Sequence, residues 1–129
     1  MPTITYTLTN AGHNLFRDGA QGAANPKITY AALGTSSTAP TATDTRLGAE
    51  AFRKKVTSYT NTGSTGETII SMYLAPGEAV GVTIAEVAFF GGNATSTANS
   101  GTMFARGLYS PSHTKTNLES ITFPLDLTT

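Results

Sequence analysis

Residues 82–90 read Val-Thr-Ile-Ala-Glu-Val-Ala-Phe-Phe and form the most apolar run of this chain. Apolar side chains occupy both alternating sets of the run, with Val82, Ile84, Ala88 and Phe90 on one side and Ala85, Val87 and Phe89 on the other. A β-strand that is apolar on both faces is covered on both faces. We therefore predict that residues 82–90 form a strand in the middle of a β fold.

Alternation of apolar and polar residues predicts further strands along the rest of the chain. They cover residues 4–8, 28–33, 52–59, 67–75, 102–109 and 121–127. The turn-rich segments 60–66 and 91–101 predict two hairpins, one of 52–59 with 67–75 and one of 82–90 with 102–109. Pro124 cannot donate to a strand ladder, so we place the last strand at a sheet edge or a bulge, where another subunit can pair with it.

Two segments have helical rather than strand character. Residues 10–18 follow a capping residue, Thr9 or Asn10, and we expect Gly19 to stop this short helix in a left-handed conformation. A second, brief helical turn is expected after Thr43-Asp44-Thr45, carrying Leu47. The stretch 34–44 has no apolar period and contains Pro40, which predicts an exposed excursion.

The length of the chain limits how many cores it can bury. A chain of 129 residues with 39% apolar content is the size of one domain, and two domains would leave each too small. Together the elements predict a single domain over residues 1–129. Its expected fold class is all-β, an antiparallel β-sandwich-like domain with one or two short helices.

Composition excludes several functional classes. The chain has eight cationic and eight anionic side chains, no net charge and no cysteine, so disulfides and cysteine-bound zinc are excluded. The only cationic run, Arg53-Lys54-Lys55, alternates between two strand faces, and we interpret it as a solvated strand end rather than a nucleic-acid site. The chain has no apolar run near the eighteen or so residues that cross a bilayer and no basic, apolar start, so we expect a soluble protein without membrane contacts.

The titratable residues are too scattered to predict an active site. His13 and His113 have no carboxylate or second ligand at a useful local spacing, which is typical of surface histidines rather than metal ligands or a general base. The chain also lacks the Gly-x-Ser-x-Gly elbow of many hydrolases. We expect no catalytic residues, no cofactor and no metal.

Glu86 stands out because it lies inside the most apolar strand. An unpaired buried carboxylate costs several kcal/mol, so Glu86 should find a cation or backbone amides. Arg106, in the neighbouring predicted strand, is the natural partner. We predict a cross-strand ion pair of Glu86 with Arg106 in a structural role, and a catalytic acid is the alternative reading of Glu86.

Several short motifs occur in an order that resembles a known family. They are YTLTNAG at 6–12, ITYAALG at 28–34, TAPT at 38–41, TIAEVAFF at 83–90 and GTMFAR at 101–106. This order is similar to the N-terminal domain of tailed-bacteriophage tail-fibre proteins. The chain departs from the family at Ala88, where glycine is frequent, and at Gly91-Gly92, where aspartate is common. Fibre proteins continue into a shaft and a receptor-binding tip, so we expect a free-standing short relative.

The resemblance implies a non-enzymatic structural protein of the virion, made in the host cytoplasm. We expect it to act as a tail-fibre-like attachment or appendage module, assembled as a homotrimer with other phage proteins of the tail, baseplate or capsid. One alternative is a capsid-decoration protein on the head lattice. Another is a host-receptor or carbohydrate-binding module, for which Tyr59, Tyr73 and Tyr109 are the available aromatics. The expected contact surfaces are the terminal strands and two loops, 34–44 and 91–101, with candidate contact residues Thr38, Pro40, Thr41, Asn93, Thr95 and Asn99.

Overall fold

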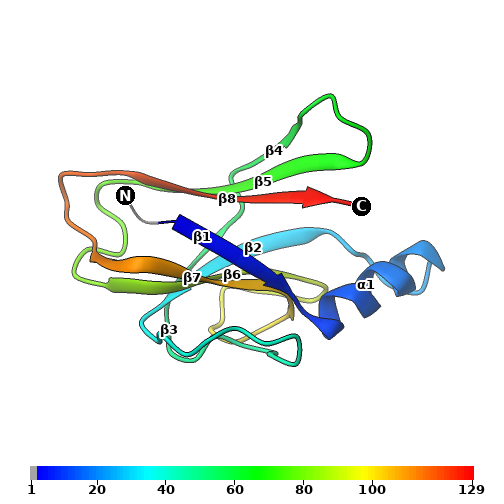
Figure 1. The fold of residues 1–129 in the computed structure, drawn as a ribbon, viewed down its shortest axis with the longest axis horizontal. Coiled ribbons are helices and arrows are strands. Elements are labelled where there is room, and N and C mark those ends of the chain that lie inside the picture. The colour runs from blue at the N-terminus through cyan, green and yellow to red at the C-terminus, as the bar shows by residue number, and fades with distance from the viewer. Residues whose placement is uncertain (1–2) are drawn as a thin grey trace.

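The computed structural model describes residues 3–129 and shows two antiparallel sheets packed face to face (Figure 1). Sheet A has the strand order β1-β7-β6-β2-β3, and sheet B has the order β4-β5-β8. The strands are β1 (Thr3–Leu8), β2 (Ile28–Gly34), β3 (Glu50–Lys55), β4 (Ser58–Asn61), β5 (Glu67–Leu74), β6 (Thr83–Gly91), β7 (Thr102–Thr114) and β8 (Ile121–Thr128), and the helix α1 spans Asn10–Ala20. The predicted all-β sandwich is confirmed, with one short helix.

Strand β6 occupies the centre of sheet A, as its apolar sequence predicts. It pairs with β2 on one side and with β7 on the other, and every residue of β6 after Thr83 is buried. Its inner face contributes Val87 and Phe89 to the main core between the two sheets. Its outer face contributes Ala88 and Phe90 to a second, smaller core, which we call the outer core. Because both faces are covered, neither face of this strand is polar, and Glu86 is its one charged residue.

The predicted strand 52–59 is wrong, because the chain changes sheets within it. Residues 50–55 pair with β2 in sheet A, whereas residues 58–61 pair with β5 in sheet B. The crossing is fixed by two backbone bonds, from Val56 N to Thr29 O at 2.9 Å and from Thr57 N to Ser71 O at 2.8 Å. The hairpin with 67–75 therefore involves only β4. Periodicity cannot reveal such a crossing, since both halves keep an extended backbone.

Helix α1 begins as predicted but ends later. The Thr9 hydroxyl accepts from Gly12 N at 3.0 Å and donates to Met103 O at 2.5 Å, so it caps the helix and fastens it to β7. The helix continues through Gly19, and the left-handed residue is Gly22, with φ of 74°. Ala23 N then bonds to Asp18 O at 2.8 Å, which completes a Schellman-type end.

The second helical turn expected at 43–47 does not form. The carboxylate of Asp44 instead accepts from the backbone N of Thr41 at 3.0 Å and from its hydroxyl at 3.0 Å, closing a non-helical turn. Leu47 is buried, but it packs into the outer core rather than on a helix face. Asp and Thr favour such local bonds outside helices, which explains why the capping signal was misleading.

Strand β8 is an edge strand of sheet B, as Pro124 predicts. Within residues 3–129 its only pairing is with β5, where Pro124 lies opposite Ser71. The alternate residues Phe123, Leu125 and Leu127 are buried in the main core. A proline is tolerated here because the edge strand bonds on one side only.

Candidate functional site

Glu86 and Arg106 form an ion pair on the outer face of sheet A. In the β6–β7 register, Glu86 lies opposite Leu108 and Arg106 opposite Ala88, so the two charged side chains are diagonal neighbours on one face. Arg106 donates to Glu86 Oε1 through Nη2 at 2.9 Å and through Nε at 3.0 Å. Glu86 is 0% exposed and Arg106 is 2% exposed. The predicted cross-strand pair is confirmed.

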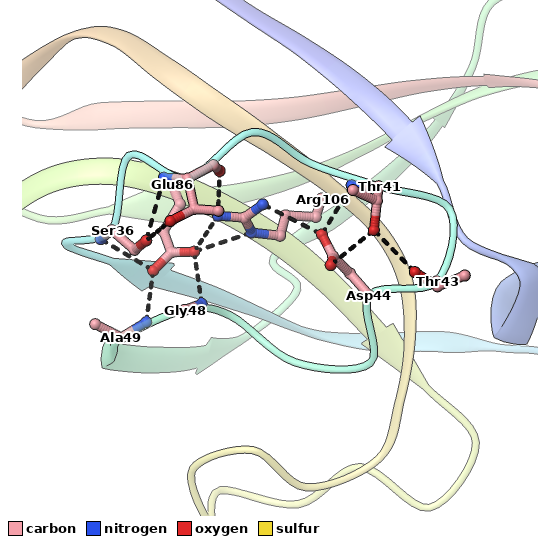
Figure 2. Close-up of polar contacts among 9 residues, drawn as sticks. Ser36, Thr41, Thr43, Asp44, Gly48, Ala49, Glu86 and Arg106 are labelled. Carbon is pink, nitrogen blue, oxygen red and sulfur yellow. Dashed lines mark hydrogen bonds and ion pairs between the residues drawn. The ribbon is translucent and has the colours of Figure 1, made fainter.

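The rest of the Glu86 carboxylate is bound by the backbone of the loop that joins β2 to β3 (Figure 2). Ser36 N donates to Oε2 at 3.1 Å, Gly48 N to Oε1 at 2.9 Å and Ala49 N to Oε2 at 2.8 Å. These donors come from both ends of the loop. Glu86 therefore ties the two ends of residues 35–49 to the sheet with charge-assisted hydrogen bonds.

Arg106 holds the middle of the same loop. It donates to Thr38 O at 2.8 Å and to Asp44 Oδ2 at 3.2 Å. Partial burial acts to raise the pKa of Asp44, but hydrogen bonds from Thr41 and the nearby charge of Arg106 bring it below its ordinary value. Asp44 is therefore ionised at neutral pH, and Figure 2 shows its carboxylate between the guanidinium and Thr41, whose hydroxyl also bonds to that of Thr43.

Two glycines leave room for this arrangement. A Cβ on Gly34 would overlap the carboxylate of Glu86 and lie 2.7 Å from Ala49 O. A Cβ on Gly48 would lie 2.5 Å from Ser36 Oγ. The backbone of the loop can approach Glu86 closely only because both side chains are absent.

A second ion pair, which the sequence analysis missed, holds the other long loop. Arg53 and Glu50 of β3 pair through Nε and Oε2 at 2.9 Å and through Nη2 and Oε1 at 3.0 Å. Arg53 Nη1 also donates to Thr95 O at 3.0 Å and to Ser100 O at 2.9 Å, and Asn99 N donates to Glu50 Oε1 at 3.2 Å. Residues 92–101 are thereby fastened to β3.

The interpretation of Arg53-Lys54-Lys55 as a solvated strand end needs correction. The Arg53 side chain is 3% exposed, and its guanidinium carbon lies 4.3 Å from the centre of the Phe90 ring. Lys54 Nζ pairs with Glu78 Oε1 at 2.7 Å, and Lys55 alone is exposed. The three residues do point to different faces, but two of the three cations are used inside the molecule.

The two pinned loops cover one side of the sandwich, and we call residues 35–49 and 92–101 the loop face. Figure 1 shows both loops on the side of sheet A away from sheet B, and Leu47 and Ala94 meet in the outer core. All six candidate contact residues lie on the loop face. Five are exposed and Pro40 is partly buried: Thr38, Pro40, Thr41, Asn93, Thr95 and Asn99. Asp44 and Arg46 are the only charged residues in these loops, and Asp44 is paired.

His113 has a carboxylate partner that the sequence analysis did not find. His113 Nε2 lies 2.7 Å from Glu119 Oε2, and Thr116 N donates to the same oxygen at 2.9 Å. The hydrogen bond to His113 is the main cause that lowers the pKa of Glu119 to about 2. The pair links the end of β7 to the segment that connects β7 with β8. The two residues are six positions apart in the sequence, so no local motif reveals their contact. The other histidine, His13, is exposed on α1.

Lys115 is a further buried cation that sequence reasoning missed. It is 1% exposed, and its ammonium donates to three backbone carbonyls, those of Ala75, Pro76 and Thr116, at 3.1, 2.9 and 2.7 Å. These bonds fasten the turn after β5 to the end of β7. Three carbonyl dipoles replace the water that this ammonium loses on burial.

The three tyrosines considered for sugar stacking each have a partner within the chain. Tyr59 donates to Ile28 O at 2.5 Å, and Tyr73 lies under the Lys54 ammonium, 5.7 Å from the ring centre. Tyr109 packs edge-on against Phe123 with a centroid distance of 5.3 Å. Their contacts account for their positions without a ligand.

Comparison of the chain with family models, with curated proteins and with solved structures gives no match. Among residues 3–129, no group of three or more His, Cys, Asp or Glu side chains is placed to hold a metal ion. In the same residues, no helix has the length and apolar character needed to cross a membrane.

Proposed function

We propose that this protein is a structural, non-enzymatic component of a tailed-phage virion, and that it attaches to neighbouring virion proteins through the loop face. The observation that carries this proposal is the pinning of both long loops by buried arginine–glutamate pairs. Among the ion pairs of residues 3–129, these two are the most buried, and both hold a surface loop in place. The resemblance of the short motifs to tail-fibre attachment domains supplies the virion context.

A pinned, nearly uncharged surface suits binding to a protein. The cores of protein interfaces are depleted in charged residues, and the loop face exposes threonine, serine, alanine and asparagine, with Arg46 as its one charge that forms no ion pair within residues 3–129. Binding costs less conformational entropy when the loops are already ordered. Repeated copies on a particle then add their weak contacts into tight attachment.

Copy number in purified particles tests the attachment role. A tail or fibre module of a symmetric appendage is expected in small multiples of about three or six per particle, measured by quantitative mass spectrometry. A count on the order of hundreds would favour capsid decoration of the head lattice. Absence of the chain from particles, or substrate turnover that disappears on substitution of His113, would contradict the proposal.

Charge placed on the loop face tests the surface itself. We expect Asn93→Arg and Thr38→Arg to reduce incorporation into particles, because each puts a cation on a surface that is close to neutral. Thr65→Arg is the matched control, since Thr65 is also exposed but lies in the turn between β4 and β5. Equal loss in all three variants, with folding intact, would show that the loop face is not the contact surface.

A further inference from the structure

The edge strands of the two sheets differ in how open they are to another strand. Natural edges are protected by charge, by proline or by short length. β3 carries Glu50 and the cations 53–55, β4 has four residues, and β8 contains Pro124. β1, with the sequence TITYTL, has none of these features. Among the edges in residues 3–129, β1 is the unprotected one.

The backbone of β1 presents alternate residues to its open side. Thr9 N donates to Phe104 O at 3.0 Å, and the register continues with Thr7 opposite Arg106. Because bonding alternates along an antiparallel pair, residues 3, 5, 7 and 9 bond toward β7. The backbone groups of Ile4, Tyr6 and Leu8 therefore point away from β7, toward the edge.

A groove runs between this edge and β8, and we call it the seam. Two hollows of about 520 and 550 Å³ lie next to each other along it and have Ile4 and Pro124 in common. Figure 1 shows β1 and β8 pointing in the same general direction. Half-buried Ile4 and Tyr6 contribute apolar surface, and the Tyr6 hydroxyl is the one buried side-chain polar atom in residues 3–129 without a hydrogen-bond partner. The seam is elongated, apolar inside and flanked by unused backbone groups.

The charges along the seam are mostly negative. Glu119 lines one hollow and Asp126 the other, and no lysine or arginine lines either. His113 is the only basic residue among the lining side chains. Glu67 lies near Asp126 and raises its pKa, so a second acidic side chain stands beside this end of the seam. A segment with positive charge complements this rim.

We propose that the seam binds an extended segment of a neighbouring virion protein, in which apolar residues alternate with polar ones and lysine or arginine is present. The segment pairs with the open edge of β1 and covers Ile4, Tyr6 and Leu8 with its apolar side chains, as in other cases of strand addition. Its cations face Glu119 and Asp126. This inference rests on the proposed function, since it names the type of partner that an assembly module receives.

A second copy of the chain fits the seam less well. Six residues of β1 extend about 20 Å, and two packed sheets lie about 10 Å apart, so an edge-to-edge contact covers on the order of 200–400 Å² per partner. Stable dimers bury more than this, about 800 Å² per partner. A single peptide strand in the seam contacts both β1 and β8. It therefore does not need the large flat contact area by which two copies form a stable dimer.

Binding of a short peptide to the whole protein tests the proposal. The probe is a fluorescein-labelled peptide of about eight residues in which valine alternates with lysine and threonine, long enough to follow β1. The comparison peptide has glutamate in place of lysine. We expect the basic peptide to bind with a dissociation constant well below about 1 mM and more weakly as salt is added, measured by fluorescence anisotropy.

Two variants and one control locate the binding site. Ile4→Pro removes an outward N–H of β1 and should weaken binding about tenfold or more. Asp126→Asn leaves the fold intact, because its side chain is exposed, and should weaken binding of the basic peptide about threefold. Asp18→Asn removes a carboxylate on α1 that lines neither hollow and should change nothing. Circular dichroism verifies that each variant is folded.

Several results would overturn the proposal. They are no binding at about 1 mM peptide, equal binding of the acidic peptide, or equal weakening by Asp18→Asn and Asp126→Asn. Dimerisation of the wild-type protein that Ile4→Pro abolishes would assign the seam to a second copy instead. If the protein is incorporated into particles but binds no peptide, the seam proposal fails while the proposed function stands. If the peptide binds and particles lack the protein, the proposed function fails.

Discussion

Arg106 Nη2 lies 2.9 Å from Glu86 Oε1 on the outer face of sheet A, and the loop of residues 35–49 supplies further hydrogen-bond partners to both side chains. The pair is thus the anchor of a loop rather than an isolated contact between two strands. Buried ion pairs contribute little net stability compared with apolar replacements, but they are costly to break. Their value here is that they fix one loop conformation.

Removal of one charge from this pair should be strongly destabilising. We expect Glu86→Gln to lower the free energy of unfolding by about 3 kcal/mol, because Arg106 stays buried with Asp44 as its only remaining anion. Urea denaturation measures the change. The double variant Glu86→Gln with Arg106→Met should recover part of the loss, since the one charge left without its partner, Asp44, is partly exposed to solvent rather than buried. A single-variant loss under about 0.5 kcal/mol would contradict the assigned role.

The close approach of the loop to the sheet should make Gly34 intolerant of a side chain. Gly34→Ala places a Cβ against Glu86 and Ala49 O, and we expect a loss of about 1–3 kcal/mol in thermal or urea unfolding. Gly77→Ala is the matched control, because no atom lies within 4 Å of a Cβ built there. That control should be within about 0.5 kcal/mol of the wild type. Similar losses in both variants would mean that the Glu86 contact is not the cause.

The Arg53–Glu50 pair should control the order of residues 92–101 separately from the other loop. Arg53→Lys replaces a planar group that makes several directed bonds by a single ammonium. Hydrogen exchange with mass spectrometry should show faster exchange at 92–101 and little change at 35–49. Lys55→Ala is the control, since Lys55 is exposed. Equal acceleration in both loops would indicate a general loss of stability instead.

The contact between His113 and Glu119 should make the stability of the protein depend on pH. The pKa of Glu119 is about 2 in the folded protein and is near its ordinary value of 4.5 when unfolded. The unfolded chain therefore takes up the proton first, so the stabilisation is present above pH 4.5 and is lost as pH falls toward 2. Urea midpoints measured across this range should decline in the wild type. Glu119→Gln should remove this part of the decline, and an unchanged slope would refute the assignment.

Local sequence patterns were sufficient to predict the elements whose burial follows from their own residues. The double apolar alternation of 82–90 predicted a central strand, and Pro124 predicted an edge. The pairing of Glu86 with Arg106 followed from the same logic, because a carboxylate in such a strand requires a donor and the neighbouring strand offered one cation. The short helix after Thr9 was also found, although Gly22 rather than Gly19 ends it.

Contacts between distant segments were beyond this reasoning. From the sequence, Arg53 was interpreted as part of a solvated run. In the fold, the loop 92–101 provides carbonyl acceptors for its guanidinium, and the ring of Phe90 lies against it. Lys115 is buried because three carbonyls from two chain segments meet at one point. A charged residue can be buried only where such partners converge, and a linear pattern does not contain that information.

The sequence by itself determined the fold class, the position of the central strand and the need for a partner to Glu86, because alternation directly reports which faces of a strand are apolar. The tertiary structure alone decided that residues 52–59 divide between two sheets, that two arginines hold two loops over one face, and that β1 and β8 leave a seam. Those features depend on which distant segments come to lie side by side. Long-range packing sets that arrangement, and the energy of each buried charge is defined only once it is in place.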